Sequence, residues 1–255
     1  MRASLIALTA AIIVLLFVSL RGGAQPLREI PFASGALNSP VVAELFTSQS
    51  CSSCPSAEKL FAELADRSDL IVLEWHVDYW DRLVHGRAGA WKDPYSNKDN
   101  TARQRQYNRA LRNMAGVYTP QAVINGRSET VGNQANDIAQ LLEAARYATA
   151  RIDISRDDGR LNVSISAFGS DLRRSAAITR LTLLPEQTTS VPRGENRGAI
   201  LTSRNVVIAT ELIGLYTGAR TSISIAAPRV GETCAVIIQE KQGGRLGPIL
   251  GASYC

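Results

Sequence analysis

The chain has 255 residues, of which 45% are hydrophobic and 20% are charged, and its formal net charge at neutral pH is +5. This is the composition of an ordinary globular protein, and it excludes a disordered or low-complexity chain. Basic residues are scattered, as at Arg103 and Arg105, so the charge pattern does not favour a nucleic acid as partner.

The N-terminus predicts export. Arg2 precedes an apolar run from Leu5 to Leu20, and Arg21-Gly22-Gly23-Ala24 follows it. We interpret residues 1–24 as a signal peptide with cleavage after Ala24; the alternative is an uncleaved anchor, the one case in which a membrane would be a partner. Both interpretations place the remainder in the periplasm or outside the cell.

Residues 25–38 are rich in Pro, Gly and Ser and are expected to form a leader. Residues 39–148 then predict the order strand, helix, strand, helix, strand, strand, helix. The expected elements are a strand at 41–46, a helix to about 66, a strand at 70–77, a helix at 100–114, strands at 122–124 and 128–131, and a helix at 134–146. Asn125-Gly126 is a strong hairpin signal between the two short strands.

Beyond residue 149 the pattern changes to short alternating segments with no convincing helix. Seven strands are expected, at 151–155, 161–167, 177–184, 206–210, 221–226, 234–239 and 248–253. So many short strands in about a hundred residues favour an all-β, immunoglobulin-like sandwich as a separate domain, 149–255.

The sequence Cys51-Ser52-Ser53-Cys54 lies between the first strand and the first helix. At a helix N-terminus a cysteine thiolate is favoured, because free backbone N–H groups and the helix dipole attract negative charge. Cys51 is therefore the expected nucleophile, and Cys54, one turn later, is expected to close or resolve a disulfide. Ser52 and Ser53 either donate hydrogen bonds to the Cys51 sulfur or are small residues required by a tight turn.

The chain resembles the thioredoxin superfamily in the CSSC between strand and helix, in the segment GVYTPQAVING at 116–126, and in the final strand pair and helix. The segments SQSCSSCPSAE, WHVDYWDRL and YTPQAVINGR further resemble a bacterial family of exported thioredoxin-like proteins classed as of unknown function. The resemblance implies an α/β thioredoxin-like domain at 39–148. It also implies that Pro120 is a cis-proline and that Thr119 and Pro120 present an extended substrate to the cysteines. An ordinary trans-proline at the end of a helix is the alternative for Pro120.

Polar and aromatic residues follow the second strand at the sheet edge where ligands gather in open α/β sheets. His76, Asp78 and Trp80 are therefore candidates for substrate binding, and Glu74 or Asp78 for accepting a proton from the resolving cysteine. Packing aromatics and satisfied polar groups at a strand end are the alternative. His85 and Trp91, in the next loop, are weaker candidates.

The other two cysteines lie far from the CSSC. A hairpin centred near Gly243-Gly244-Arg245 would place Cys234 opposite Cys255, close enough for a structural disulfide. The alternative is an exposed C-terminal thiol that exchanges with the CSSC pair.

The predicted function is that of an exported thiol–disulfide oxidoreductase without cofactor or metal. Its partners would be protein or small-molecule thiols and disulfides, together with a redox partner protein. Two alternatives stay open: a Cu(I)-handling protein that uses the two thiolates, with His76 as a further ligand, and a binding module in which residues 51–54 form a structural disulfide.

Overall fold

The computed structural model describes residues 39–83, 89–145, 149–167, 175–243 and 245–255. The predicted signal peptide, residues 1–24, and the leader, 25–38, lie outside the described residues, as does His85. Residues from Ala36 to Cys255 form one compact unit. No helix among the described residues is long and apolar enough to cross a membrane.

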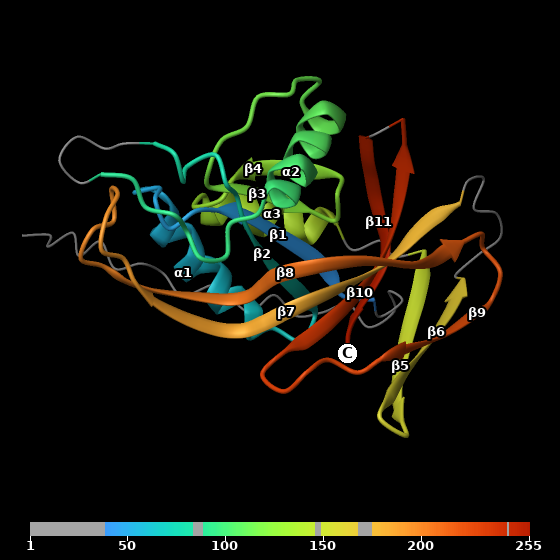
Figure 1. The fold of residues 1–255 in the computed structure, drawn as a ribbon. Helices are drawn as coiled ribbons and strands as arrows, with labels where there is room; N and C mark the ends of the chain where they lie inside the picture. The colour runs from blue at the N-terminus through green and yellow to red at the C-terminus, as the bar shows by residue number, and fades with distance from the viewer. Residues whose placement is uncertain (1–38, 84–88, 146–148, 168–174, 244) are drawn as a thin grey trace, which may run out of the picture. The chain divides into compact units, whose positions relative to one another are not determined.

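The first seven elements follow the order that the sequence predicted (Figure 1). They are β1 (Val41–Thr47), α1 (Cys54–Ala65), β2 (Leu70–His76), α2 (Lys98–Leu111), β3 (Gln121–Ile124), β4 (Ser128–Val131) and α3 (Ala135–Ala144). β1 is parallel to β2 and antiparallel to β3, and β3 pairs antiparallel with β4. α1 and α3 pack on one face of these strands and α2 on the other.

The remaining strands are longer and differently placed than predicted. They are β5 (Ala150–Asp157), β6 (Arg160–Ala167), β7 (Ala176–Ser190), β8 (Ile200–Tyr216), β9 (Thr221–Ala226), β10 (Thr233–Gln242) and β11 (Arg245–Tyr254). Among the described residues they form part of an eight-stranded sheet, in the order β11-β10-β7-β8-β2-β1-β3-β4, and a three-stranded sheet, β5-β6-β9.

The predicted fold class, an α/β thioredoxin-like domain followed by a separate immunoglobulin-like sandwich, is therefore wrong. β8 joins β2 in parallel, with Val206 opposite Glu74, so that four of the later strands extend the first sheet. The three-stranded sheet covers one end of this extension and shares a third apolar core with it. The predicted division at residues 148 and 149 remains a prediction.

The reason lies in β7 and β8, which pair over almost their whole lengths. The sequence predicted only 177–184 and 206–210 because the halves next to the turn, 185–190 and 200–205, are rich in polar residues. The resulting hairpin runs past the end of its own core to reach the first strands and α1. Figure 1 shows its turn, in orange, beside the segment that leads into α1.

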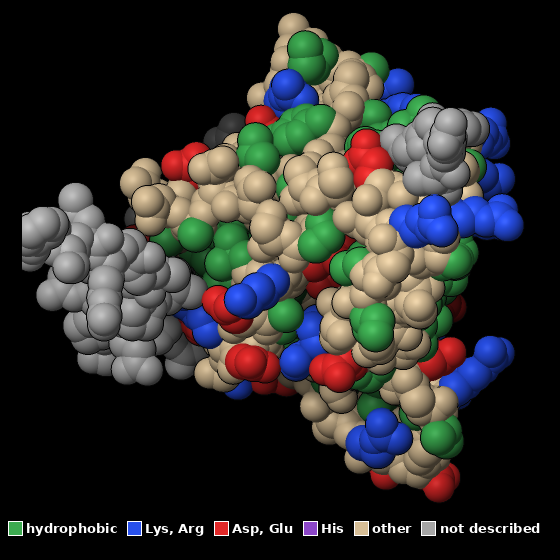
Figure 2. All heavy atoms as spheres, turned by 90° about the vertical axis from the view of Figure 1, so that its left-hand side faces the viewer, with side chains coloured by type: hydrophobic (Ala, Val, Ile, Leu, Met, Phe, Trp, Pro, Cys, Tyr) green, Lys and Arg blue, Asp and Glu red, His purple; other side chains and the backbone are tan. Residues whose placement is uncertain are grey.

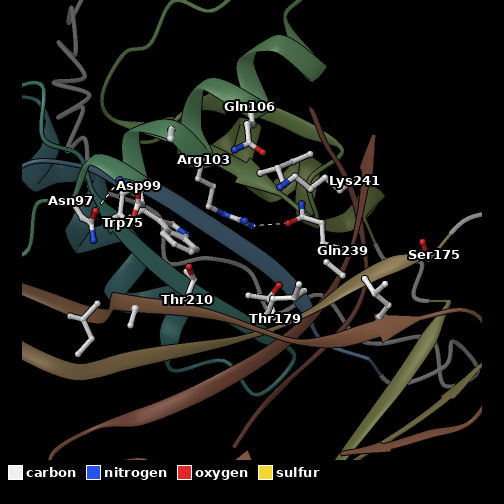
Figure 3. A pocket seen from close by; sticks show the side chains of 18 residues that line it. Trp75, Asn97, Asp99, Arg103, Gln106, Ser175, Thr179, Thr210, Gln239 and Lys241 are labelled. Atoms are coloured by element: carbon white, nitrogen blue, oxygen red, sulfur yellow. Dashed lines mark hydrogen bonds between the residues drawn. The ribbon is translucent and has the colours of Figure 1, made fainter. Parts of the chain in front are cut away.

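A buried polar network connects β1 and β10 of the large sheet on the α2 side. Arg103 of α2 donates from Nε to Glu44 of β1 at 2.7 Å and from Nη2 to Gln239 of β10 at 3.0 Å. Its guanidinium also lies 4.7 Å from the Trp75 ring centre and 5.0 Å from that of Tyr107. Figure 3 shows Arg103 reaching across a groove toward Gln239.

We expect Arg103→Leu to lower the free energy of unfolding by about 3–5 kcal/mol, because it leaves the Glu44 carboxylate buried without its cation. Urea unfolding of the reduced protein measures this loss. The double variant Arg103→Leu with Glu44→Gln should recover a substantial part of it, and independent, additive losses in the two variants would contradict the coupling.

Candidate functional site

The two cysteines of the CSSC lie where β1 ends and α1 begins. Cys54 is the first residue of α1 and Pro55 the second, a position where a missing backbone N–H costs nothing. Both thiols are free, and both side chains are buried. The cysteines therefore stand at the helix N-terminus that the sequence predicted for them.

The surroundings of Cys51 stabilise its thiolate. A hydrogen bond with Cys54 contributes most to lowering the pKa of Cys51, burial opposes it, and hydrogen bonds with Ser53 and Thr119 add to the lowering. The result is a pKa of about 6. Its sulfur lies 3.3 Å from Ser53 Oγ and 3.9 Å from the carbonyl oxygen of Thr119. Cys51 is thus a thiolate at neutral pH, the form that attacks disulfides.

Cys54 has the opposite character. Burial raises the pKa of its thiol, and the neighbouring Cys51 raises it further, whereas Thr47 and the backbone of Ser48 favour the thiolate. The two cysteines thus differ strongly in how readily each loses its proton. To react, Cys54 needs a group that takes its proton.

The hydroxyl group of Thr47 connects Cys54 to a buried acid, Glu58. Thr47 Oγ1 donates to Glu58 Oε1 at 2.6 Å, and Glu58 lies on the buried face of α1. Burial, with the nearby charge of Glu74, raises the pKa of Glu58 to about 7. A carboxyl group with this pKa exchanges protons readily at neutral pH.

Glu58 belongs to a cluster of buried ionisable groups. His76 Nδ1 lies 2.7 Å from Asp93 Oδ2, and His76 Nε2 lies 3.7 Å from Glu74 Oε2. Burial opposes a charge on His76, but Asp93 outweighs it and raises the pKa of His76 well above the ordinary value. The cluster thus holds a buried imidazolium among three carboxyl groups, on the same face of the sheet as α1.

Thr119 and Pro120 face the cysteines from another loop. The Thr119–Pro120 peptide bond is cis. Trp80 Nε1 donates to Thr119 Oγ1 at 2.7 Å, so that Trp80 holds the loop whose carbonyl group faces the Cys51 sulfur. Tyr79 lies close enough for the charges of both cysteines to raise its pKa, although burial is the larger cause.

The other predicted site residues make different contacts, and only some of them lie close to the Cys51 sulfur. Ser53 contacts the Cys51 sulfur, but Ser52 donates its backbone N–H to Glu195. His76 is fully buried, with Glu74 and Asp93 as neighbours. Asp78 accepts a hydrogen bond from Thr101 Oγ1 at 2.6 Å.

Of the two expected proton acceptors, Asp78 is bound to α2, and Glu74 is in the cluster but bonded at Oε1 by the backbone N–H of Arg204. Trp91, the weaker candidate, donates to Gln49 Oε1 at 3.2 Å and so supports the turn before Cys51. The roles of these residues remain predictions.

Sequence reasoning missed Glu58, Asp93, Glu195 and Asn196. Glu58 gave a signal, because an acid at the fourth residue after Cys54 shares the apolar helix face with Ala57 and Phe61. Asp93, Glu195 and Asn196 gave none, because they reach the site only through long loops that the fold brings back to it.

Cys234 and Cys255 form a disulfide bond with Cα atoms 5.2 Å apart, far from the CSSC in sequence. Strands β10 and β11 pair in the register that their spacing predicted, from Ala235 opposite Tyr254 to Ile238 opposite Gly251. The bond fixes the C-terminal residue to β10 and lies in the core beneath the three-stranded sheet.

A hollow of about 740 Å³ lies on the opposite, α2 face of the large sheet (Figure 3). Trp75, Arg103 and Lys241 line it together with apolar residues of β8, and it contains no cysteine. No group of three or more His, Cys, Asp or Glu side chains within the described ranges is arranged to hold a metal ion. The CSSC, with its two free thiols, is the candidate site.

Comparison with known families decides the relationship of the chain. Residues 42–239 match the family model described as protein of unknown function, DUF1223. The chain belongs to the DUF1223 family. Its match includes the CSSC, the cis-proline segment and the β7–β8 hairpin, so these parts are within one family unit.

Two solved structures resemble this DUF1223 protein. Protein AGR_C_4864 from Agrobacterium tumefaciens is 30% identical, with a TM-score of 0.73 over 87% of this chain and 95% of that one. HBP35 of Porphyromonas gingivalis is 12% identical, with a TM-score of 0.57 over 87% of this chain and 76% of that one, and shows similarity of fold alone. No curated protein matches the chain.

We expect the alkylation rate of Cys51 by iodoacetamide to rise with pH around a midpoint of about 6, because only the thiolate reacts. Mass mapping of the reduced protein after timed quenching identifies the labelled cysteine. Cys54 should stay unlabelled throughout. A midpoint for Cys51 near that of an ordinary thiol, about 8.5, would contradict the description of its surroundings.

Proposed function

We propose that this DUF1223 protein is a thiol–disulfide oxidoreductase that exchanges disulfides with thiols of proteins or small molecules. The observation that carries the proposal is the opposite character of the two free cysteines. Cys51 has a pKa lowered to about 6, and Cys54, one turn away, has a raised pKa and an acid within reach. A structural disulfide has no need of this difference. The suggested relation to the thioredoxin superfamily belongs to the proposal as well.

The proposed exchange has two steps. The Cys51 thiolate attacks one sulfur of a substrate disulfide, so that the substrate S–S bond breaks and the other sulfur leaves as a thiolate that takes a proton from water. Cys54 then loses its proton and attacks the Cys51 sulfur. This closes the Cys51–Cys54 bond and releases the second substrate thiol. The substrate disulfide is reduced and the cysteine pair oxidised, and the reverse sequence oxidises a dithiol.

Glu58 is the proposed proton acceptor for the second step. Thr47 donates its hydroxyl proton to Glu58 and can accept the proton of Cys54, so the two side chains form a short relay. A pKa of about 7 lets Glu58 take this proton and later return it without a large energy barrier. The positive charge of His76 favours the ionised form of Glu58, whereas the negative charge of Asp93 opposes it.

The Cys234–Cys255 disulfide supports the export proposed from the N-terminus, because such bonds persist in the periplasm and the extracellular space. In Figure 2, a view of the side where the β7–β8 turn lies, acidic and basic side chains are interspersed. Proteins or small molecules carrying disulfides, with a redox partner protein, are the proposed partners.

Trapping of the mixed disulfide tests the proposed function. Cys54→Ser, treated with oxidised glutathione, should accumulate glutathione on Cys51, because the resolving thiol is missing, whereas Cys51→Ser should stay unlabelled. The unchanged protein should release reduced glutathione and end as the Cys51–Cys54 disulfide. If Cys54→Ser takes up no glutathione within minutes at pH 7, the protein is not an oxidoreductase.

We expect Glu58→Gln to slow the resolving step by about 10²-fold, the usual contribution of a positioned proton acceptor. In the unchanged protein, the step should accelerate as pH rises through about 7, where Glu58 ionises. The variant should lose this inflection. Quenched-flow mass analysis of the mixed disulfide measures both.

Glu63→Gln, on the exposed side of the same helix, is the matched control and should behave as the unchanged protein. An inflection near pH 7 that persists in Glu58→Gln would assign the proton to another group.

A further inference from the structure

The turn between β7 and β8 contacts the backbone around Cys51 directly, although about 145 residues separate them. Asn196 donates from Nδ2 to the carbonyl oxygens of Gln49 and Cys51, both at 2.9 Å. Glu195 Oε2 accepts the backbone N–H of Ser52 at 2.8 Å. Two neighbouring side chains of the turn thus bind three backbone groups of residues 49–52, the segment that carries Cys51.

The remaining backbone groups of this segment are bonded from the other side. The Gln49 N–H donates to Asp93 Oδ2 at 2.9 Å, the Ser50 N–H to Ser48 Oγ at 3.2 Å, and the Cys51 N–H to the Ser48 carbonyl at 3.1 Å. Without Asn196, the carbonyl oxygen of Gln49 would lose this hydrogen bond. Because the sulfur position follows from the backbone of Cys51, the turn contributes to the site geometry.

The turn is held in shape by its own backbone hydrogen bonds. The Val191 N–H donates to the Ala199 carbonyl at 2.9 Å, and the Ala199 N–H donates to the carbonyl of Asn196 at 3.0 Å. Gly194 has a φ of +80°, and a Cβ atom there would lie 3.3 Å from Trp91 Cβ, so a side chain would crowd this contact. The backbone conformation of the turn is therefore restricted, and Asn196 is held close to the CSSC segment.

The hairpin is also fixed farther from its turn, at Arg204. Arg204 of β8 lies 3.2 Å from Asp66 at the end of α1 and 3.5 Å from Glu186 of β7. The Arg204 N–H donates to Glu74, a member of the buried cluster. Arg204 thus connects the hairpin both to the C-terminal end of α1 and to Glu74 of the buried cluster.

We propose that Asn196 and Glu195 are positioning residues of the CSSC site, through which the outer strands set the reactivity of Cys51. Asn196 orients the backbone of residues 49–51 so that the Cys51 sulfur stays near Ser53 and Thr119, the groups that favour its thiolate. Glu195 holds the Ser52 N–H away from that sulfur and places a carboxylate at the edge of the site. This inference deepens the proposed function and rests on it for the role of Cys51 as nucleophile.

The test compares Asn196→Leu, which keeps the size of the side chain but removes both donated hydrogen bonds, with Arg197→Ala. Arg197 is the exposed neighbour and serves as the matched control. The first readout is the midpoint pH of Cys51 alkylation by iodoacetamide, measured well below the thermal midpoint of every variant. We expect Asn196→Leu to raise this pH by about one unit, a tenfold change in the ionisation constant, and Arg197→Ala to leave it unchanged.

Glu195→Gln and Glu195→Ala separate charge from hydrogen bonding at the second contact. Glutamine still accepts the Ser52 N–H but carries no charge, so a change in both variants is due to the lost charge and a change in alanine alone to the lost bond. The second readout is the rate of mixed-disulfide formation with oxidised glutathione, which should fall severalfold in Asn196→Leu. Circular dichroism of each variant verifies that the fold is retained.

A merely structural role would lower the thermal midpoint of Asn196→Leu and leave its alkylation midpoint equal to that of Arg197→Ala, and this result would overturn the inference. Alkylation needs no turnover, so the readout remains valid if the pair proves to have no exchange activity. A shifted alkylation midpoint without exchange would refute the proposed function and retain the positioning. Normal exchange with an unshifted midpoint would do the reverse.

Discussion

The arrangement of the site depends on one strand pairing, between the edge of β2 and β8. Val206 lies opposite Glu74 in parallel, and the Arg204 N–H donates to the Glu74 carboxylate at 3.1 Å. Next to this short pairing, Tyr254 occupies the edge of β2, where its hydroxyl accepts from the Val72 N–H and donates to the Val72 carbonyl. This junction places β7 and β8 in the same sheet as β1 and β2, and the β7–β8 turn contacts the segment that contains Cys51.

The junction also explains why so many ionisable groups can be buried beneath the CSSC. Burying a single charge costs several kcal/mol unless it is paired and hydrogen-bonded. Here β8 covers Glu74 and the loop before α2 contributes Asp93, so that the cluster contains both a cation and the acids that it stabilises. An acid with a pKa near neutrality, Glu58, is the consequence, and proton exchange at pH 7 requires such a group.

Local sequence patterns predicted the order of the first seven elements correctly, because short motifs determine the backbone conformation there. The CSSC at a strand end, Pro55 in the first helical turn and Asn125-Gly126 between short strands each specify a backbone conformation through their own chemistry. The pairing of β10 with β11 followed in the same way from a turn and two cysteines. Polar outer halves of β7 and β8 carry no such signal, because their partners are each other and α1 rather than a core.

The same distinction applies to the site. Cys51 and Cys54 can be read from the sequence, and Glu58 could have been, from its place on the apolar face of α1. Asn196 and Glu195 could not, because their contacts exist only once β8 has joined β2, and that pairing has no local signature. The predicted sandwich failed for this reason: strand number and alternation indicate all-β structure but do not say which sheet a strand joins.

The reduction potential of the Cys51–Cys54 pair tests the account most directly. The purified protein is equilibrated with glutathione buffers of defined ratio, and the thiols are trapped and counted by mass. A thiolate at Cys51 and a resolving thiol at Cys54 predict a potential between about −120 and −270 mV, reached within minutes. A pair that stays oxidised below about −300 mV would be a structural disulfide and would contradict the account.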